Sequence, residues 1–150
     1  MPADASRVGH LLLDASVLVE LVIAGRHRAS ADRVLDQIRD DGDLVIVTAA
    51  HGMVEAASAI RRLVRAGALD AEQGSAAVRW LSTFDVVLDP TSPRLHAIWR
   101  LRDTMTAYDA AYAAAADALG LPLITTDERL RRACLSAGIA CSHLDEAFAD

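Results

Sequence analysis

Residues 106–130 read TAYDAAYAAAADALGLPLITTDERL, and this stretch decides which fold the sequence predicts. Its alanine-rich part, 106–119, is strongly helical and stops at Gly120, a residue type that commonly ends helices. Residues 121–125 form a short apolar run typical of a buried strand, and Asp127 opens another helical segment. A helix, a strand and a helix in immediate succession predict an α/β domain.

The same alternation of short apolar strands and longer helices runs through the rest of the chain. We expect the other strands at 9–13, 44–47, 85–88 and, at an edge, 139–141. We expect the other helices at 16–24, 30–39, 48–66, 70–81 and 127–137, and one more that follows a turn marked by Pro90 and Pro93 and runs to about residue 102. This order predicts a three-layer α/β/α sandwich with a mainly parallel sheet of four to five strands. No repeat or linker interrupts it, so we expect a single domain over residues 1–150.

The charge pattern excludes several classes of protein. All 15 basic residues are arginine and the formal net charge is −6. Without lysine there is no P-loop, and an acidic total does not indicate nucleic-acid binding through overall charge.

No apolar run is long enough for a membrane span and no signal peptide is evident, so we expect a cytoplasmic protein. Cys134 and Cys141 do not indicate a disulfide scaffold.

Acidic side chains follow two of the predicted strands. Asp14 ends the apolar run in HLLLDASVLVE (residues 10–20), and Asp127 follows the strand at 121–125. Each also fits the role of a helix N-cap, for which aspartate is a preferred residue. Because ligands of open parallel sheets bind at the carboxyl ends of strands, both side chains are candidates for one site.

Asp109 lies inside a predicted helix, where aspartate is a poor choice. At 100° per residue, Tyr108, Tyr112 and Leu119 share a face that we expect to lie in the core. Asp109 lies beside that face among small alanines, which let an ion or another element approach its carboxylate. Asp117 is about 12 Å further along the helix axis, too far to bind the same ion, and we expect it to be solvated or capping.

Glu55 has the weakest signal of its own. By helical periodicity it is an ordinary surface residue, since it shares a face with His51, Ser58 and Arg62. Only the set formed with Asp14, Asp109 and Asp127 makes it a site candidate.

A group of carboxylates needs a cation, because like charges held close together repel each other. In a chain without lysine, a divalent metal ion is the simplest such cation. Oxygen ligands without clustered histidine or cysteine indicate Mg²⁺ or Mn²⁺ rather than zinc. The five histidines show no metal-ligand spacing, and we expect them to be surface or core residues. In such a pocket Mg²⁺ binds phosphate oxygens and activates water.

Three segments together resemble the PIN-domain ribonucleases, and among them the toxins of VapBC-type toxin–antitoxin pairs. They are LLLDASVLVE (11–20), MVEAASAIRRL (53–63) and residues 106–130, so the resemblance covers essentially the whole chain. The resemblance implies an α/β/α sandwich. In this family, a quartet of acidic residues binds Mg²⁺ or Mn²⁺, and the matching residues here are Asp14, Glu55, Asp109 and Asp127. Asp14 and Asp109 would be the most direct ligands, with the other two acting partly through water. Ser16 matches the small polar residue two places after the first acid, and Thr126 matches the small polar residue before the last acid.

The resemblance also implies a function. Such proteins cleave RNA endonucleolytically, often tRNA or ribosomal RNA, with a metal-activated water that leaves a 3′-hydroxyl and a 5′-phosphate. It further implies a homodimer, which brings two acidic pockets to one groove, and a heteromeric complex with a cognate antitoxin that blocks this groove with its C-terminal segment.

A protein with a net charge of −6 must bind RNA through local basic groups. Guanidinium groups bind both phosphates and carboxylates. The arginines near the candidate site, which could contact RNA or the antitoxin, are Arg26, Arg28, Arg62, Arg65 and Arg129. Each could equally be a solvated side chain paired with a nearby acid.

Two other functions stay open from the sequence. An aspartate-based phosphohydrolase would use a similar sheet, but such enzymes rely on a lysine, and the DAS sequence at 14–16 lacks the second acid of a DxD motif. A catalytically silent PIN-fold binding module would keep the fold without cleaving RNA, although all four acids are present.

Overall fold

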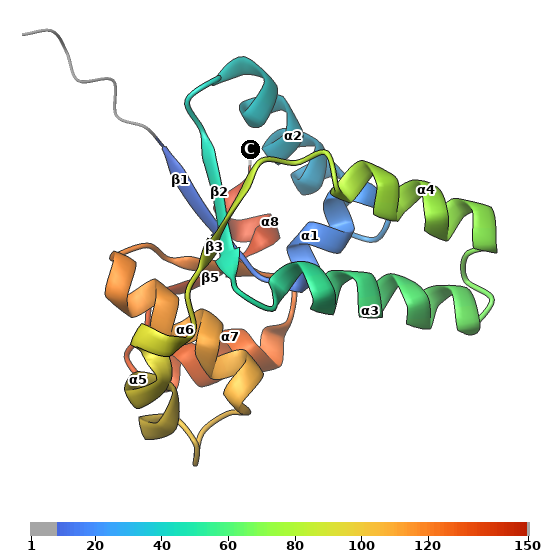
Figure 1. Cartoon of the computed structure of the whole chain (residues 1–150). Helices are drawn as coiled ribbons and strands as arrows, with labels where there is room; N and C mark the ends of the chain where they lie inside the picture. Colours follow the sequence, from blue (N-terminus) through green and yellow to red (C-terminus); the bar gives the residue numbers. More distant parts are fainter. Residues whose placement is uncertain (1–8, 150) are drawn as a thin grey trace, which may run out of the picture.

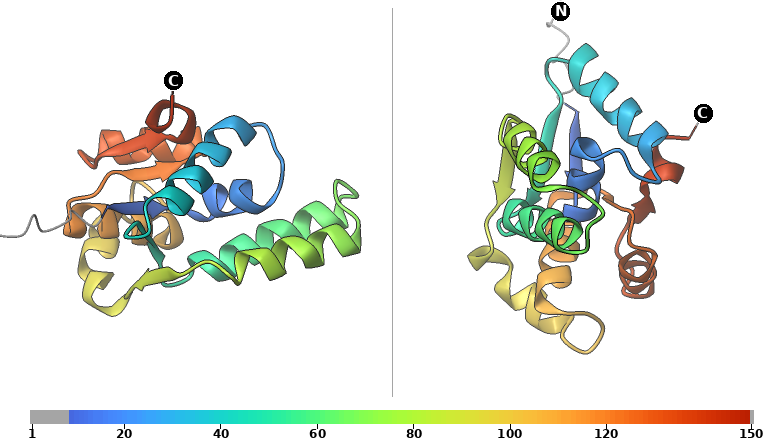
Figure 2. Two further views of the ribbon diagram at one scale, coloured as in Figure 1. Left: turned by 90° about the horizontal axis from the view of Figure 1, so that it is seen from above. Right: turned by 90° about the vertical axis from the view of Figure 1, so that its right-hand side faces the viewer.

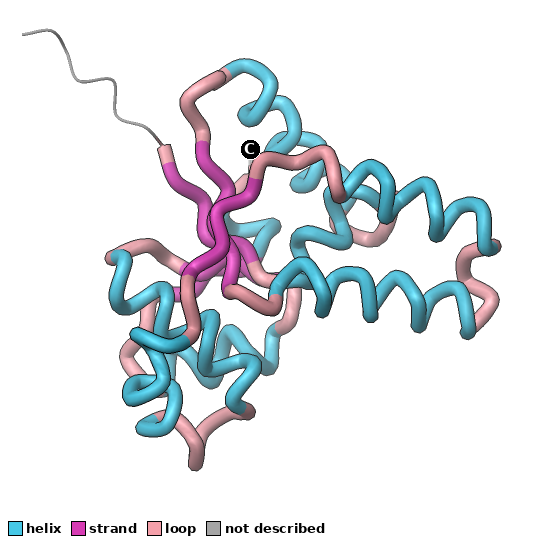
Figure 3. Tube along the Cα trace, viewed as in Figure 1, coloured by secondary structure: helices cyan, strands magenta, loops and turns pink. Residues whose placement is uncertain are grey.

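A parallel sheet of five strands in the order β3-β2-β1-β4-β5 forms the centre of the molecule (Figure 1; Figure 3). The computed structural model describes residues 9–149. The strands are β1 (His10–Leu13), β2 (Val45–Ala49), β3 (Val86–Asp89), β4 (Leu123–Thr125) and β5 (Cys141–His143). The predicted fold class is confirmed, and the sheet has the larger of the two expected numbers of strands.

Helices cover both faces of the sheet, as the α/β/α prediction requires (Figure 2). On one face lie α1 (Ala15–Val22), α2 (Arg28–Asp40), α3 (Gly52–Arg65), α4 (Ala71–Leu81) and the short α8 (Leu144–Ala147). On the other face lie α5 (Leu95–Arg100), α6 (Ala107–Leu119) and α7 (Glu128–Ser136), with a 3₁₀ turn at Ser92–Arg94 before α5. Within the described part of the chain, no helix is long and apolar enough to cross a membrane.

Successive residues of the central strands pack into different cores, because side chains alternate across a sheet. Leu12 and Leu123 belong to the core under α5–α7, whereas Leu13 and Ile124 belong to the core under α1–α4. All four are at most 4% exposed. Burial on both faces explains why these strands are continuous apolar runs rather than alternating patterns.

The core face predicted for helix α6 was wrong for two of its three residues. Tyr112 is fully buried, but Tyr108 is 69% exposed and Leu119 is 41% exposed. The alanines at 110–116 are all buried, so the middle of the helix is enclosed by α5 and the sheet while both ends project. Small side chains, which give little amphipathic signal, therefore make most of this contact.

Element ends also differ from the sequence prediction. Thr48 was expected to open a helix, but it lies fully buried in β2, and α3 begins only at Gly52. The last strand lies at Cys141–His143, two residues later than expected, and α8 was not predicted. The helix expected at 70–81 is confirmed, with Asp70 and Gln73 forming a capping box. Cys134 and Cys141 are free, buried thiols.

Helices α3 and α4 pack against each other as a hairpin that projects from the sheet (Figure 1; Figure 2). The base of this hairpin depends on a close approach between α3 and β2. A Cβ atom added at Gly52 would overlap the side chain of Thr48, which is fully buried and cannot move aside easily. Gly52 is therefore required by packing and not by its backbone angles.

We predict that Gly52→Ala destabilises the protein by about 1–3 kcal/mol, the usual cost of overpacking a buried contact. Urea denaturation of the variant and the wild type measures this difference. Gly42→Ala is the matched control, because a Cβ atom there meets nothing within 4 Å. Equal stability of Gly52→Ala and Gly42→Ala would contradict the packing argument.

Candidate functional site

The candidate site lies at the carboxyl ends of β1 and β4, two neighbouring strands of the sheet. The helices that follow these strands, α1 and α7, pack on opposite faces of the sheet. This divergence is the switch point at which open α/β sheets form their binding crevice. Asp14 lies at the end of β1 and Asp127 lies just after β4.

Both aspartates are helix N-caps, so the ordinary structural role proposed for each is also present. The backbone amide of Val17 donates to Asp14 Oδ1 at 3.2 Å. Asp127 Oδ1 accepts from the amides of Arg129 and Leu130 at 2.9 and 3.1 Å. Capping uses one oxygen of each carboxylate and leaves the other for a different partner.

Asp14 is the most deeply buried acid of the site, only 4% exposed. Removal from water disfavours the charged carboxylate and raises the pKa of Asp14 from its ordinary 3.8 to about 6. Hydrogen bonds from Ser16, Thr125 and the amide of Val17 oppose this rise. The side chain is thus held in place by donors but lacks a full counter-charge.

Thr125 connects Asp14 to Asp127. Its hydroxyl donates to Asp14 Oδ2 at 2.5 Å and accepts from the backbone amide of Asp127 at 2.9 Å. Ser16 donates to Asp14 Oδ1 at 2.5 Å and accepts from the amide of Thr126 at 2.9 Å. The sequence prediction named Thr126 and missed Thr125, the residue whose side chain makes the contact. The buried hydroxyl at the last position of a strand beside Asp127 was the available signal.

Glu55 approaches the site from α3. The hydroxyl of Tyr112 donates to Glu55 Oε2 at 3.2 Å, and Nε2 of His51 lies 3.1 Å from the same oxygen. Burial, together with the charges of Glu55 and Asp14, raises the pKa of Tyr112 well above its usual range, so the phenol stays a donor. Glu55 is 38% exposed, which places it at the rim of the site instead of on an open surface.

A guanidinium group joins the remaining two acids. Arg129 lies 2.9 Å from Asp109 Oδ2 and 3.4 Å from Asp127 Oδ2. Asp109 is 13% exposed and is placed in the first turn of α6 by the Thr106 cap, whose hydroxyl accepts from the Asp109 amide. Arg129 therefore supplies a positive charge between two carboxylates in this structure.

A cavity of about 390 Å³ opens beside these side chains. It lies between α3 and the start of α6, and residues of both helices and of α7 line it. The lining residues are His51, Val54, Glu55, Ser58, Thr106, Tyr108, Asp109 and Arg129. The cavity thus gives a ligand access to two of the four predicted acids.

The donor set fits a divalent cation with oxygen ligands. Thr125 links Asp14 to Asp127, and Arg129 links Asp127 to Asp109. Glu55 holds the hydroxyl of Tyr112, and its charge helps to raise the pKa of Asp14. The guanidinium already occupies a place suited to a cation. No three of the four carboxylates have oxygens all within 4.8 Å of one another in the described residues. A small ion would therefore contact some of them directly and others through water.

The other residues named from the sequence lie outside this network. Asp117 is exposed near the end of α6. Arg28 pairs with Asp32 at 3.2 Å, and Arg26 is exposed in the loop before α2. Arg62 donates to Ser58 beside the cavity at 3.4 Å, whereas Arg65 lines a separate groove between α3 and α4.

Comparison with known proteins gives one family match and several similar proteins. A model of the PIN domain family matches residues 11–135. Ribonuclease VapC3 of Mycobacterium tuberculosis is 37% identical over 127 residues, covering 85% of this chain and 89% of the relative. The crystal structure of PAE2754 from Pyrobaculum aerophilum superposes with a TM-score of 0.65 at 26% identity, covering 94% and 88% of the two chains. The crystal structure of VapBC2 from Rickettsia felis bound to a promoter DNA fragment superposes with a TM-score of 0.62 at 13% identity. The match covers 89% of this chain and 98% of that chain.

The raised pKa of Asp14 predicts a pH-dependent loss of stability. The unfolded chain releases this proton near pH 3.8 and the folded chain only near 6, so stability falls as the pH rises between these values. At 1.36 kcal/mol per pKa unit, metal-free Asp14→Asn should be more stable than the wild type at pH 8 by up to about 3 kcal/mol.

Urea denaturation with a chelator at pH 8 and pH 5 measures this difference, which should shrink at the lower pH. Asp117→Asn, which changes an exposed carboxyl, should show no such dependence. An Asp14→Asn variant no more stable than the wild type at pH 8 would show that burial does not penalise the ionised carboxylate.

Proposed function

This chain belongs to the PIN domain family and, within it, to the VapC ribonucleases, and we propose that it is a divalent-metal-dependent endoribonuclease that acts as the toxin of a toxin–antitoxin pair. The observation that carries the proposal is the convergence of four acids at the β1/β4 switch point. Asp14 and Asp127 come from strand ends, Glu55 from α3 and Asp109 from α6.

The four acids would coordinate Mg²⁺ or Mn²⁺ in two ways, directly and through water. Asp14 and Asp109, the two most buried acids, are the direct ligands, while the more exposed Glu55 and Asp127 act partly through water. When bound, the ion supplies a Lewis acid for phosphate oxygens and lowers the pKa of water for in-line attack. Ser16 and Thr125 orient Asp14, and Tyr112 orients Glu55.

RNA would approach through the cavity beside Glu55 and Asp109. Arg129 on one wall and Arg62, which is held by Ser58, offer guanidinium groups to backbone phosphates. Tyr108 projects from the start of α6, 69% exposed, and an exposed aromatic ring at such a place can stack on an unpaired base. This lining favours a single-stranded loop within a structured RNA, such as tRNA or ribosomal RNA.

The proposed partners would use the same surface. We propose a homodimer that sets two acidic cavities along one groove, and a cognate antitoxin whose C-terminal segment occupies that groove. An acidic group of the antitoxin would take the arginines that otherwise contact RNA phosphates, since guanidinium binds carboxylate and phosphate in the same way.

We predict that Asp14→Asn and Asp109→Asn each lower RNA cleavage at least about 100-fold, and that EDTA abolishes it. Losing one direct ligand removes several kcal/mol of transition-state stabilisation, at 1.36 kcal/mol per tenfold. Cleavage of total cellular RNA with Mg²⁺ or Mn²⁺, followed by sequencing of RNA 5′ ends, measures the rate and identifies the target.

Asp117→Asn is the matched control for Asp109→Asn, because both acids lie on α6 but Asp117 is exposed away from the network. It should cleave at the wild-type rate. If the antitoxin-free wild type cleaves no cellular RNA with metal supplied, the chain is a binding module; trapping of a phosphoaspartate on Asp14 would instead indicate a phosphohydrolase.

Arg129 should compete with the metal ion, because its guanidinium lies against two of the proposed ligands, Asp109 and Asp127. We predict that Arg129→Gln binds Mn²⁺ several-fold more tightly than the wild type in calorimetric titration without RNA. Arg132→Gln, on the same helix, should leave Mn²⁺ affinity unchanged. Weaker Mn²⁺ binding by Arg129→Gln would mean that the arginine organises the carboxylates and does not compete for them.

A further inference from the structure

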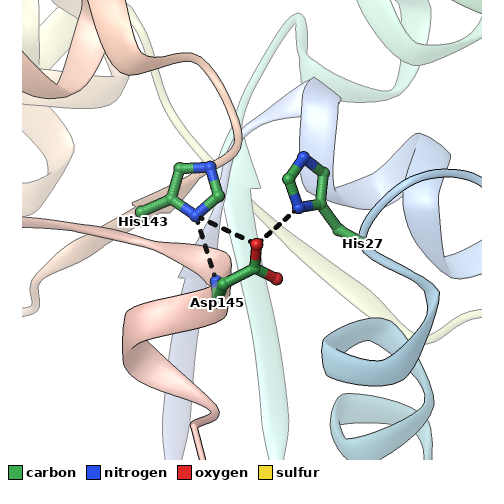
Figure 4. A group of neighbouring side chains, drawn as sticks. All are labelled: His27, His143 and Asp145. Atoms are coloured by element: carbon green, nitrogen blue, oxygen red, sulfur yellow. Dashed lines mark hydrogen bonds and ion pairs between the residues drawn. The ribbon is translucent and has the colours of Figure 1, made fainter.

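Two histidines and an aspartate meet between the start of α2 and the C-terminal helix α8 (Figure 4). His27 is the residue before α2, His143 ends β5, and Asp145 lies in the first turn of α8. One nitrogen of each ring and one carboxylate oxygen all lie within 4.8 Å of one another. Among the described residues, no other set of histidine, cysteine or acidic side chains is grouped this closely.

The three side chains point at a common centre. Nδ1 of His27 lies 2.7 Å from Asp145 Oδ2, and Nδ1 of His143 lies 3.8 Å from the same oxygen. The two imidazole rings face each other edge to face with centroids 5.0 Å apart. Ligand atoms of a tetrahedral zinc ion, at bond lengths of about 2.0–2.2 Å, are separated by roughly 3.3–3.6 Å. The observed spacings lie on either side of that value, so small side-chain movements would bring the three ligands to bonding distance.

Neighbouring groups orient the Asp145 carboxylate and fix the protonation of both ring nitrogens. The hydroxyl of Ser30, a buried side chain, donates to Asp145 Oδ1 at 2.7 Å and leaves Oδ2 turned toward the histidines. The Asp145 amide donates to Nδ1 of His143 at 3.1 Å, so this nitrogen is unprotonated, and a metal ion would take its lone pair in place of this hydrogen bond. Nδ1 of His27 donates its proton to Asp145 Oδ2, and a metal ion would replace that proton.

We propose that His27, His143 and Asp145 form a zinc site with two imidazole nitrogens and one carboxylate oxygen as ligands. Imidazole suits Zn²⁺, whereas the all-oxygen acidic site suits Mg²⁺ or Mn²⁺. Both histidines are 16% exposed and Asp145 is 50% exposed, so water reaches the carboxylate side and completes the coordination. Three protein ligands and one water form a recognised zinc coordination.

Such an ion would tie together distant parts of the chain. His27 and Asp145 are separated by 118 positions, and they join the loop after α1 to the helix that follows the edge strand β5. An ion would add to the hydrogen bonds by which Ser30 and Arg33 of α2 already hold Asp145 and the carbonyl of Phe148. The site would therefore stabilise the docking of α8.

The test is a calorimetric titration of the metal-free protein with ZnCl₂ in excess Mg²⁺, which keeps the acidic site filled. The wild type should bind one zinc ion per chain, and zinc should raise its melting temperature. His27→Ala and His143→Ala should each weaken binding at least about tenfold and lose the rise in melting temperature. His96→Ala, which removes an exposed histidine elsewhere, and Asp14→Asn should bind zinc like the wild type.

Cobalt supplies a measurement that does not depend on the folding of any variant. Wild-type protein loaded with Co²⁺ in excess Mg²⁺ should show the intense visible absorption of a four-coordinate ion with nitrogen ligands. Only weak absorption, or zinc binding that is unchanged in His143→Ala and lost in Asp14→Asn, would overturn the proposal.

Discussion

The burial of the Asp14 carboxylate between β1 and β4 is the constraint on which the acidic site depends. Apolar residues on both faces of β1 leave this side chain only 4% exposed, and its pKa rises to about 6. Thr125 and Ser16 keep it oriented but bring no positive charge. The fold thus accepts an unfavourable carboxylate where the helices that follow β1 and β4 lie on opposite faces of the sheet, and a cation would relieve its cost.

The sequence predicted those parts of the structure that local rules determine. Aspartates directly after apolar strands were placed correctly at the carboxyl edge, because strand, cap and helix follow within a few residues at Asp14 and Asp127. The sheet class followed from the alternation of short apolar runs and helices. Glu55 showed only a surface pattern, since its contacts to Tyr112 and His51 depend on how α3 crosses α6. The site roles of all four acids stay predictions.

What the sequence did not predict arises from pairing across long separations. Thr125 and Thr126 are chemically equal in sequence, and only the register of β4 against β1 selects the Thr125 hydroxyl for Asp14. The histidines were expected to lie scattered, because His27 and His143 have no ligand spacing along the chain. Their meeting requires β5 to pair at the edge of the sheet beside β4 and α2 to begin nearby. The predicted core face of α6 was wrong because alanines contribute little to the hydrophobic periodicity of a helix.

The charge balance explains how an acidic protein can keep a basic contact surface. Arg129 is 64% exposed, yet it forms ion pairs with Asp109 and Asp127. Its charge is therefore neutralised by these carboxylates as long as no other cation is present. A divalent ion at those carboxylates would free the guanidinium for a phosphate at the same edge of the cavity. Metal binding and phosphate binding would then favour each other through one side chain, without any change in the net charge of −6. The exchange of carboxylate partners for a phosphate at Arg129, more than the overall charge of the protein, would bring RNA to this site.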